Sequence, residues 1–171
     1  DESATKMKTL NNVHINQAIK TPQFYQLWIV LCFNVSAGIG VIGVAKTMMS
    51  EIFGSAPAGS EMATMVTAGF AGTYVLMISV FNMCGRFIWA SLSDYIGRKN
   101  TYHCFFVIGT LLYLSIPFAA NAVSVDPKIM YLIMFYAATM IIFTMYGGGF
   151  ATIPAYLADM FGTMHVGGIH G

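Results

Sequence analysis

Four long stretches of the chain contain no Asp, Glu, Lys or Arg, and this feature restricts the possible folds more than any other. They cover residues 21–45, 62–85, 100–125 and 129–158, and they hold 25, 24, 26 and 30 residues. A bilayer core of about 30 Å is crossed by about 20 apolar residues in a helix. Each stretch can therefore cross once, and none can cross twice. Because backbone polar groups in lipid must be paired within the segment, the sequence predicts an all-α membrane protein with about four transmembrane helices.

Composition supports the same class. Charged residues make up 9% of the 171 residues and hydrophobic residues 57%, whereas a soluble domain carries about 25% charged residues. A soluble enzyme is therefore excluded. The net charge of +1 provides no basic surface for nucleic acid. The expected partner is the lipid bilayer, and no nucleic acid is expected.

The uncharged stretches and their flanking residues give approximate helix boundaries. The expected helices are Phe24–Met49, Met62–Ser93, Thr101–Ala120 and Ile129–Thr152. Pro154 is expected to end the last helix, because proline lacks the backbone N–H that a helix interior requires. The segment 154–161 would then lie along the membrane surface.

The two ends of the chain differ from its middle. Residues 1–22 are polar and are predicted to form a cytoplasmic linker, and residues 23–171 a partial transmembrane half-domain. The last residues, 166–171, resemble the start of a fifth apolar helix. We therefore expect a parent protein that continues past Gly171 with further spans.

Lysine and arginine set the expected orientation. Three lysines precede the first span and Arg98 and Lys99 follow the second, whereas the loops at 47–61 and 121–128 contain only Lys128. Because cytoplasmic loops carry an excess of Lys and Arg, the start of the chain is expected in the cytoplasm. The protein would be a multi-pass component of the cell membrane, inner or plasma.

No residue set typical of catalysis or metal binding is present in the sequence. The three cysteines lie in apolar spans, and the four histidines show no pair at metal-ligand spacing with a third ligand. Neither a P-loop nor a dinucleotide-binding motif occurs. We expect no enzyme activity, no metal and no cofactor.

Arg86 is the candidate for recognising an anionic substrate. It lies eight residues before Asp94, about 12 Å further into the membrane along a helix. Asn82 and Ser79 precede it by four and seven residues and so share its helix face. A guanidinium presents a planar fork of donors that matches a carboxylate. The alternative is a side chain that extends to the cytoplasmic interface.

The loop after the second span is a candidate gating element. Residues 90–99 read Ala-Ser-Leu-Ser-Asp-Tyr-Ile-Gly-Arg-Lys. Gly97 can adopt the positive φ of a tight turn, and Asp94 and Arg98 can reach neighbouring helix ends. This loop could latch the cytoplasmic face, or it could be an ordinary loop of the positive-inside kind.

This loop resembles a signature of the major facilitator superfamily, Gly-x-x-x-Asp-(Arg/Lys)-x-Gly-Arg-(Arg/Lys), in its copy between the eighth and ninth helices. The matching residues are Asp94, Gly97, Arg98 and Lys99. Ala90 and Tyr95 depart from the pattern: the first loosens close helix packing and the second removes one basic charge. Segments 20–24, 82–86 and 147–159 resemble the oxalate/formate antiporter family within that superfamily.

The resemblance implies a position and a function. The four spans would be helices seven to ten of a twelve-helix transporter, and residues from Gly167 the start of helix eleven. The chain would then lack the first half and the last helices, and we expect that it cannot transport alone. The parent would carry small mono- or dicarboxylates such as oxalate, formate, lactate or pyruvate by alternating access. A structural or assembly subunit of a larger membrane complex remains the alternative.

The resemblance also implies roles for two candidate residues. An arginine at the position of Arg86 binds the carboxylate of the anion, usually with a lysine on helix eleven, which would fall beyond Gly171. An acid at the position of Asp159 pairs with the loop arginine, here Arg98, to close the inner gate. Otherwise Asp159 is a solvated acid. No Asp or Glu lies inside the spans, so proton symport and anion exchange both remain open.

Overall fold

A computed structural model of the chain describes residues 9, 12–54, 57 and 60–170, and this part is helical without any strand. Its elements are α2 (Ile15–Ala18), α3 (Pro22–Phe53), α4 (Glu61–Met65), α5 (Ala68–Ile96), α6 (Arg98–Val125), α7 (Ile129–Phe161) and α8 (Val166–His170). Within the described ranges, four helices are long and apolar enough to cross a membrane, namely α3, α5, α6 and α7. The predicted all-α bundle of four spans is confirmed.

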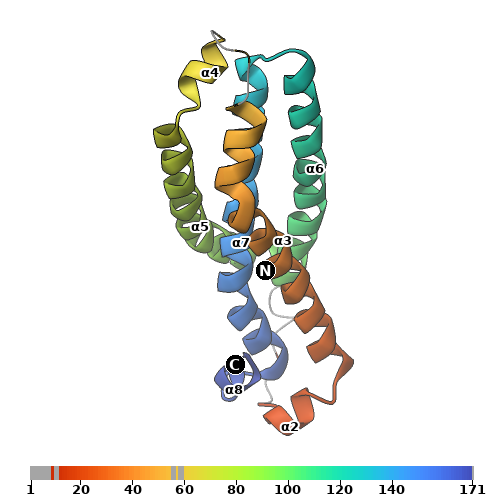
Figure 1. The fold of residues 1–171 in the computed structure, drawn as a ribbon. Coiled ribbons are helices and arrows are strands. Elements are labelled where there is room, and N and C mark those ends of the chain that lie inside the picture. Colours follow the sequence, from red (N-terminus) through yellow and green to blue (C-terminus); the bar gives the residue numbers. More distant parts are fainter. Residues whose placement is uncertain (1–8, 10–11, 55–56, 58–59, 171) are drawn as a thin grey trace.

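The four long helices run up and down alongside one another (Figure 1). Helices α2 and α8 lie at one end of the bundle, which we call the α8 end. Helix α4 and the turn between α6 and α7 lie at the opposite end, which we call the α4 end. Successive long helices are joined at alternate ends, so the link between α5 and α6 belongs to the α8 end.

Helix α7 forms the centre of the bundle. It contributes more of the buried residues than any other described helix, and α3, α5 and α6 all pack against it. Its approach to α5 is close because glycines line the crossing. A Cβ at Gly85 would overlap the backbone of Thr144, and one at Gly147 would overlap the backbone carbonyl of Asn82. Small residues let helix backbones approach in this way in membrane proteins.

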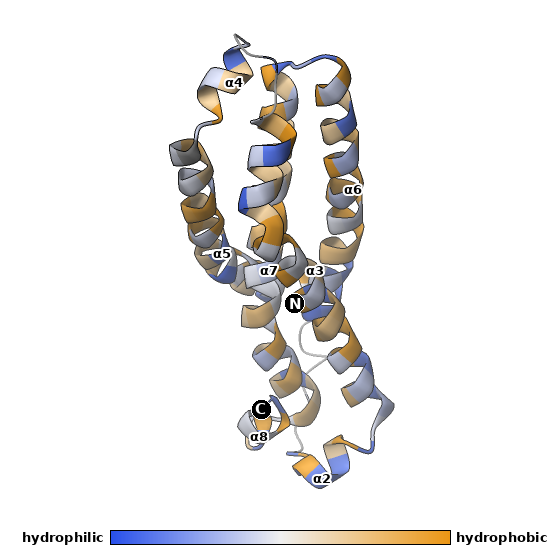
Figure 2. Ribbon diagram, viewed as in Figure 1, coloured by the Kyte–Doolittle hydropathy of each residue, from blue (hydrophilic) through white to orange (hydrophobic). Residues whose placement is uncertain are grey.

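Many of the exposed residues on the long helices are large and apolar, and hydrophobic residues run along all four of these helices (Figure 2). Such a surface is incompatible with water on all sides and fits a lipid environment. Hydrogen bonds from tyrosine hydroxyls also join the helices. Tyr102 of α6 donates to the carbonyl of Gly149 on α7 at 2.7 Å, and Tyr113 of α6 donates to the carbonyl of Ala37 on α3 at 2.8 Å.

The expected helix break at Pro154 is wrong. Helix α7 continues through this proline to Phe161, so residues 154–161 form no separate surface segment. Proline leaves only the carbonyl four residues earlier, that of Phe150, without its N–H partner. A membrane helix can contain a proline when neighbouring helices supply other hydrogen bonds and packing contacts at that level. Here the Tyr102 hydroxyl binds the adjacent carbonyl of Gly149.

The second span is shorter than expected. A helix from Met62 to Ser93 was predicted, but the chain forms α4, leaves the helical conformation at Val66 and Thr67, and begins α5 at Ala68. The Thr67 hydroxyl accepts the backbone N–H of Phe70 at 3.3 Å. This cap satisfies one of the free donors of a new helix start and explains the interruption.

The segment before α3 is packed against the end of the bundle. The Val13 N–H donates to the carbonyl of Phe161 at 2.8 Å, and the Met164 N–H donates to the Asn12 side chain at 3.2 Å. Much of the predicted linker, including Lys6 and Lys8, lies outside the described residues. Its described part makes defined contacts with α7 and the turn that follows.

Candidate functional site

A cavity of about 380 Å³ lies between α3 and α5. Its wall is apolar on the α3 side, where Ile42 and Ala45 contribute, and mixed on the α5 side. The polar residues that line it are Ser79, Asn82 and Arg86. The three residues proposed from helical spacing therefore lie along one cavity.

Arg86 is the charged group of this wall. It is exposed and makes no ion pair or hydrogen bond with another residue of the described chain. It lies ten residues before the end of α5 at Ile96, which is about 15 Å along the helix. A cation at this depth without a counter-ion can accept an anionic ligand at little cost, since no existing ion pair must be broken.

The polar neighbours of Arg86 extend the same wall. Asn82 is half-buried, and the Ser79 hydroxyl donates to the carbonyl of Val75 at 3.4 Å, a long and weak bond. Asn82 lies on the turn of α5 whose backbone touches Gly147 of α7. The tight crossing therefore fixes the position of this part of α5, and the cavity opens on a different face of the same turn.

Most of the candidate gating loop is helical, and only Gly97 lies between the two helices. Gly97 ends α5 and begins α6, with φ 88° and ψ 145°. Side chains other than glycine rarely adopt this conformation. The turn places Arg98 at the first residue of α6, directly beside the end of α5.

Arg98 connects α5, α6 and α7 at the α8 end. Its Nε donates to Oδ2 of Asp159 on α7 at 3.3 Å, and its Nη2 binds Asp94 on α5. Its Nη1 binds the hydroxyl of Ser93 and donates to the carbonyl of Ala90 at 3.5 Å. The guanidinium thus has acceptors on two neighbouring helices, as its fork of donors allows.

Other loop residues behave differently. Lys99 points to another cavity and has no ion pair among the described residues, and Tyr95 is exposed. Ser93 was missed in the sequence because a small hydroxyl gives no signal of its own. Ala90 contributes its backbone carbonyl, so the departure from glycine at this position leaves the contact with Arg98 intact.

The chain is similar in sequence to named transporters. The chain is 31% identical over 153 residues to the "Oxalate:formate antiporter" of Oxalobacter formigenes, an alignment that covers 87% of this chain and 31% of that protein. It is 26% identical over 168 residues to the "Uncharacterized MFS-type transporter YhjX" of Escherichia coli (strain K12), covering 95% of this chain and 37% of that protein.

The chain belongs to the major facilitator superfamily. It spans about a third of the length of the curated relatives that it matches. No family model matches it, and no solved structure matches it. As a major facilitator chain with four long apolar helices, it is a multi-pass integral membrane protein.

Proposed function

We propose that the complete protein is a secondary transporter of small organic anions that works by alternating access, and that Arg86 binds the carboxylate of the substrate. One observation carries this proposal: Arg86 lines a cavity between two membrane helices with Asn82 and Ser79, and no described residue neutralises it. The similarity to a protein named as an oxalate:formate antiporter supports a carboxylate as the cargo.

Each lining residue would contribute a different interaction. The guanidinium of Arg86 would hold both oxygens of one carboxylate through parallel N–H bonds. The amide of Asn82 and the hydroxyl of Ser79 would supply weaker donors that orient the rest of the anion. A second carboxylate, as in oxalate, would need a cation outside this chain. The role is binding and orientation, with no bond made or broken.

The contacts of Arg98 would act at the inner gate. With the α8 end in the cytoplasm, the ion pairs to Asp94 and Asp159 hold α5, α6 and α7 together on the cytoplasmic side. Such contacts favour states closed on that side, and their rupture would accompany inward opening. The Lys and Arg residues near this end support the orientation.

Uptake by the complete protein in liposomes tests the substrate role. Arg86→Gln removes the charge, and Arg86→Lys keeps the charge but loses the fork. A charge-assisted hydrogen bond contributes about 1.5–3 kcal/mol, so both variants should reduce the uptake of labelled formate and oxalate by about tenfold or more.

Lys46→Gln is the matched control for this experiment. It removes a cation from α3 that does not line the cavity, so uptake should stay within about twofold of wild type. Membrane abundance of all variants must be equal. Normal uptake by Arg86→Lys would remove the assignment, and absence of uptake by the wild type would favour a structural subunit.

A further inference from the structure

A second cavity, of about 340 Å³, lies at the α8 end between α3, α6 and α7. It is separate from the cavity that holds Arg86 and shares no lining residue with it. Lys99 and His103 on α6 and Gln23 and Gln26 on α3 line it, together with Tyr102 and Tyr156. No acidic residue lines it. The cavity therefore presents donors and a positive charge.

The positive charge of Lys99 is available to a ligand. Asp94 and Asp159, two acids at the same end of the bundle, are both engaged by Arg98. Lys99 itself makes no ion pair within the described part of the chain. His103 lies one helical turn deeper on the same face of α6, and its imidazole carries an N–H donor in either protonation state.

On α3 and α6 the lining changes from polar to apolar with depth, whereas the α7 part of the lining does not follow this order. On α6 the lining residues run from Lys99 through His103 to Phe106, and on α3 from Gln23 to Val30. Each series covers eight residues, so its ends lie about 10 Å apart along the helix. The same gradient separates the phosphate of a phospholipid from its acyl chains, and a free phosphate ion would leave the apolar part without a partner.

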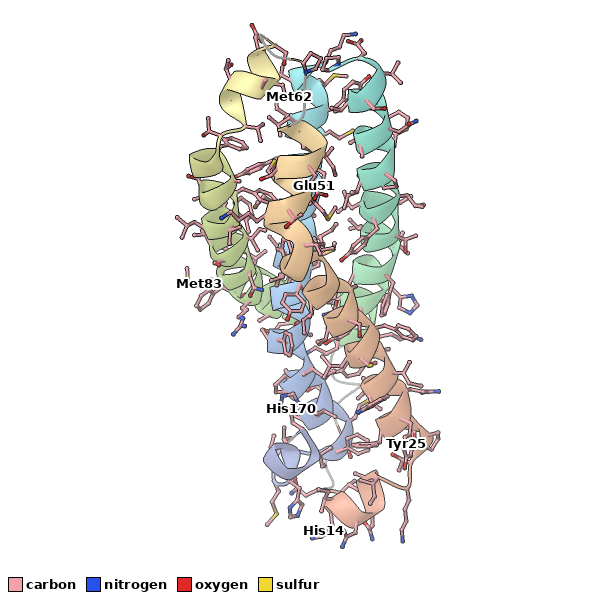
Figure 3. All side chains as sticks on the ribbon, viewed as in Figure 1. His14, Tyr25, Glu51, Met62, Met83 and His170 are labelled. Carbon is pink, nitrogen blue, oxygen red and sulfur yellow. The ribbon has the colours of Figure 1, made fainter. Side chains whose placement is uncertain are left out.

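Aromatic residues place this level of the bundle at the membrane surface. Tyr25 and Trp28 lie on the first turns of α3 and are exposed. Tyr25 projects from α3 near the α8 end (Figure 3). Tyrosine and tryptophan gather at headgroup level in membrane proteins. A cavity at the same helix turns is therefore within reach of a lipid headgroup.

We propose that this cavity binds an anionic phospholipid. Lys99 and His103 would hold the phosphate, and Gln23 and Gln26 would bind the remaining oxygens of the headgroup and glycerol. The apolar base of the cavity would receive the first part of the acyl chains. Basic pockets between membrane helices bind such headgroups on the cytoplasmic side. Because Lys99 follows Arg98 directly, a bound lipid would contact the helix turn that carries the proposed latch. The inference rests on the fold and does not require transport.

Native mass spectrometry of the complete protein with added lipid tests the proposal. Phosphatidylglycerol should be retained at least about fivefold more than phosphatidylcholine. Lys99→Gln and His103→Gln, tested separately, should each reduce retained phosphatidylglycerol by about fivefold. Lys20→Gln removes a charge from the same end without touching the cavity and should change retention by less than about twofold.

Two further measurements distinguish a lipid from a free phosphate ion as the ligand and check that the variants fold. Inorganic phosphate should not displace the lipid, and both cavity variants should keep the thermal unfolding midpoint of wild type in detergent without lipid. Equal retention of the two lipids, equal loss in Lys20→Gln, or displacement by inorganic phosphate would each overturn the assignment. Retention that falls only in the two cavity variants would establish it.

Discussion

At the scale of single residues, the environment of an ion pair decides its contribution more than its length does. The Arg98 side chain is 13% exposed, and its two carboxylate partners differ widely, with Asp159 at 20% and Asp94 at 62%. Both carboxylates contact the guanidinium. Water screens an exposed pair, however, so exposed pairs contribute about 0–1 kcal/mol. The Asp159 pair, which joins two different helices, should contribute more.

Double-mutant cycles test this ranking. The cycle of Arg98→Gln with Asp159→Asn should give a coupling energy of about 1–3 kcal/mol, near the upper part of the range for contacting residues. The cycle of Arg98→Gln with Asp94→Asn should give less than about 1 kcal/mol. The measurement is the free energy of unfolding in an SDS titration of the complete protein. A larger coupling for Asp94 would show that burial does not control these pairs.

The candidate site was partly predictable at this scale. The spacing of Ser79, Asn82 and Arg86 places them on one helix face, and the structure finds them along one cavity. That α3 forms the opposite wall could not be predicted, because the sequence does not specify which helices become neighbours. Ser93 was missed for a related reason: its partner Arg98 lies across the turn at Gly97, on the next helix.

At the scale of helices, the glycines of α5 and α7 set how close the two helices lie. Gly85→Ala places a methyl group against the backbone of Thr144, which cannot move aside as a side chain could. Overpacking of this kind costs about 1–3 kcal/mol. Because Arg86 follows directly, the displacement of α5 should also move the cavity wall. We expect a loss of stability together with a loss of substrate uptake.

Gly72→Ala on the same helix provides the comparison. A Cβ at Gly72 has nothing within 4 Å, and alanine is favoured over glycine inside a helix by about 0.5–1 kcal/mol. This variant should therefore unfold at the same or a higher SDS concentration and transport normally. If Gly85→Ala behaved like Gly72→Ala in both assays, the close crossing would not be what positions the site.

The four long helices could be predicted because the bilayer sets strict limits on a membrane span. The exact ends of these helices could not, because they depend on local contacts. An apolar stretch of about 20 residues without charge has few alternatives to a membrane helix. All four such stretches of the sequence form long helices in the structure. The break expected at Pro154 rests on the hydrogen bond that proline loses, but α7 continues through this residue, and α6 contacts α7 nearby through the hydrogen bond from Tyr102 to the carbonyl of Gly149. The interruption at Thr67 depends on one hydroxyl cap, which is not distinguishable from other threonines in the sequence.

At the scale of the whole molecule, the distribution of charge and the order of the helices lead to one orientation. The start of α3 and the end of α7 lie at the α8 end, and the ion pair of Arg98 with Asp159 ties the link between α5 and α6 to the last turn of α7. Lys20, Arg98 and Lys99 belong to this end, and cytoplasmic loops favour such residues. The gate and the lipid cavity both require this end to face the cytoplasm. A measurement of the orientation therefore bears on both the gate proposal and the lipid proposal.

Cysteine labelling of the complete protein decides the orientation. Tyr95 at the α8 end is 86% exposed and Val125 at the α4 end is 81% exposed, so single cysteines at these positions should react with a membrane-impermeant maleimide from water. In a background with serine at Cys32, Cys84, Cys104 and any other cysteine of the complete protein, Tyr95→Cys should be labelled only in inverted vesicles and Val125→Cys only in intact cells. The serine background alone controls for nonspecific labelling. The reverse pattern would place the Arg98 contacts outside the cell, where they could not close an inner gate.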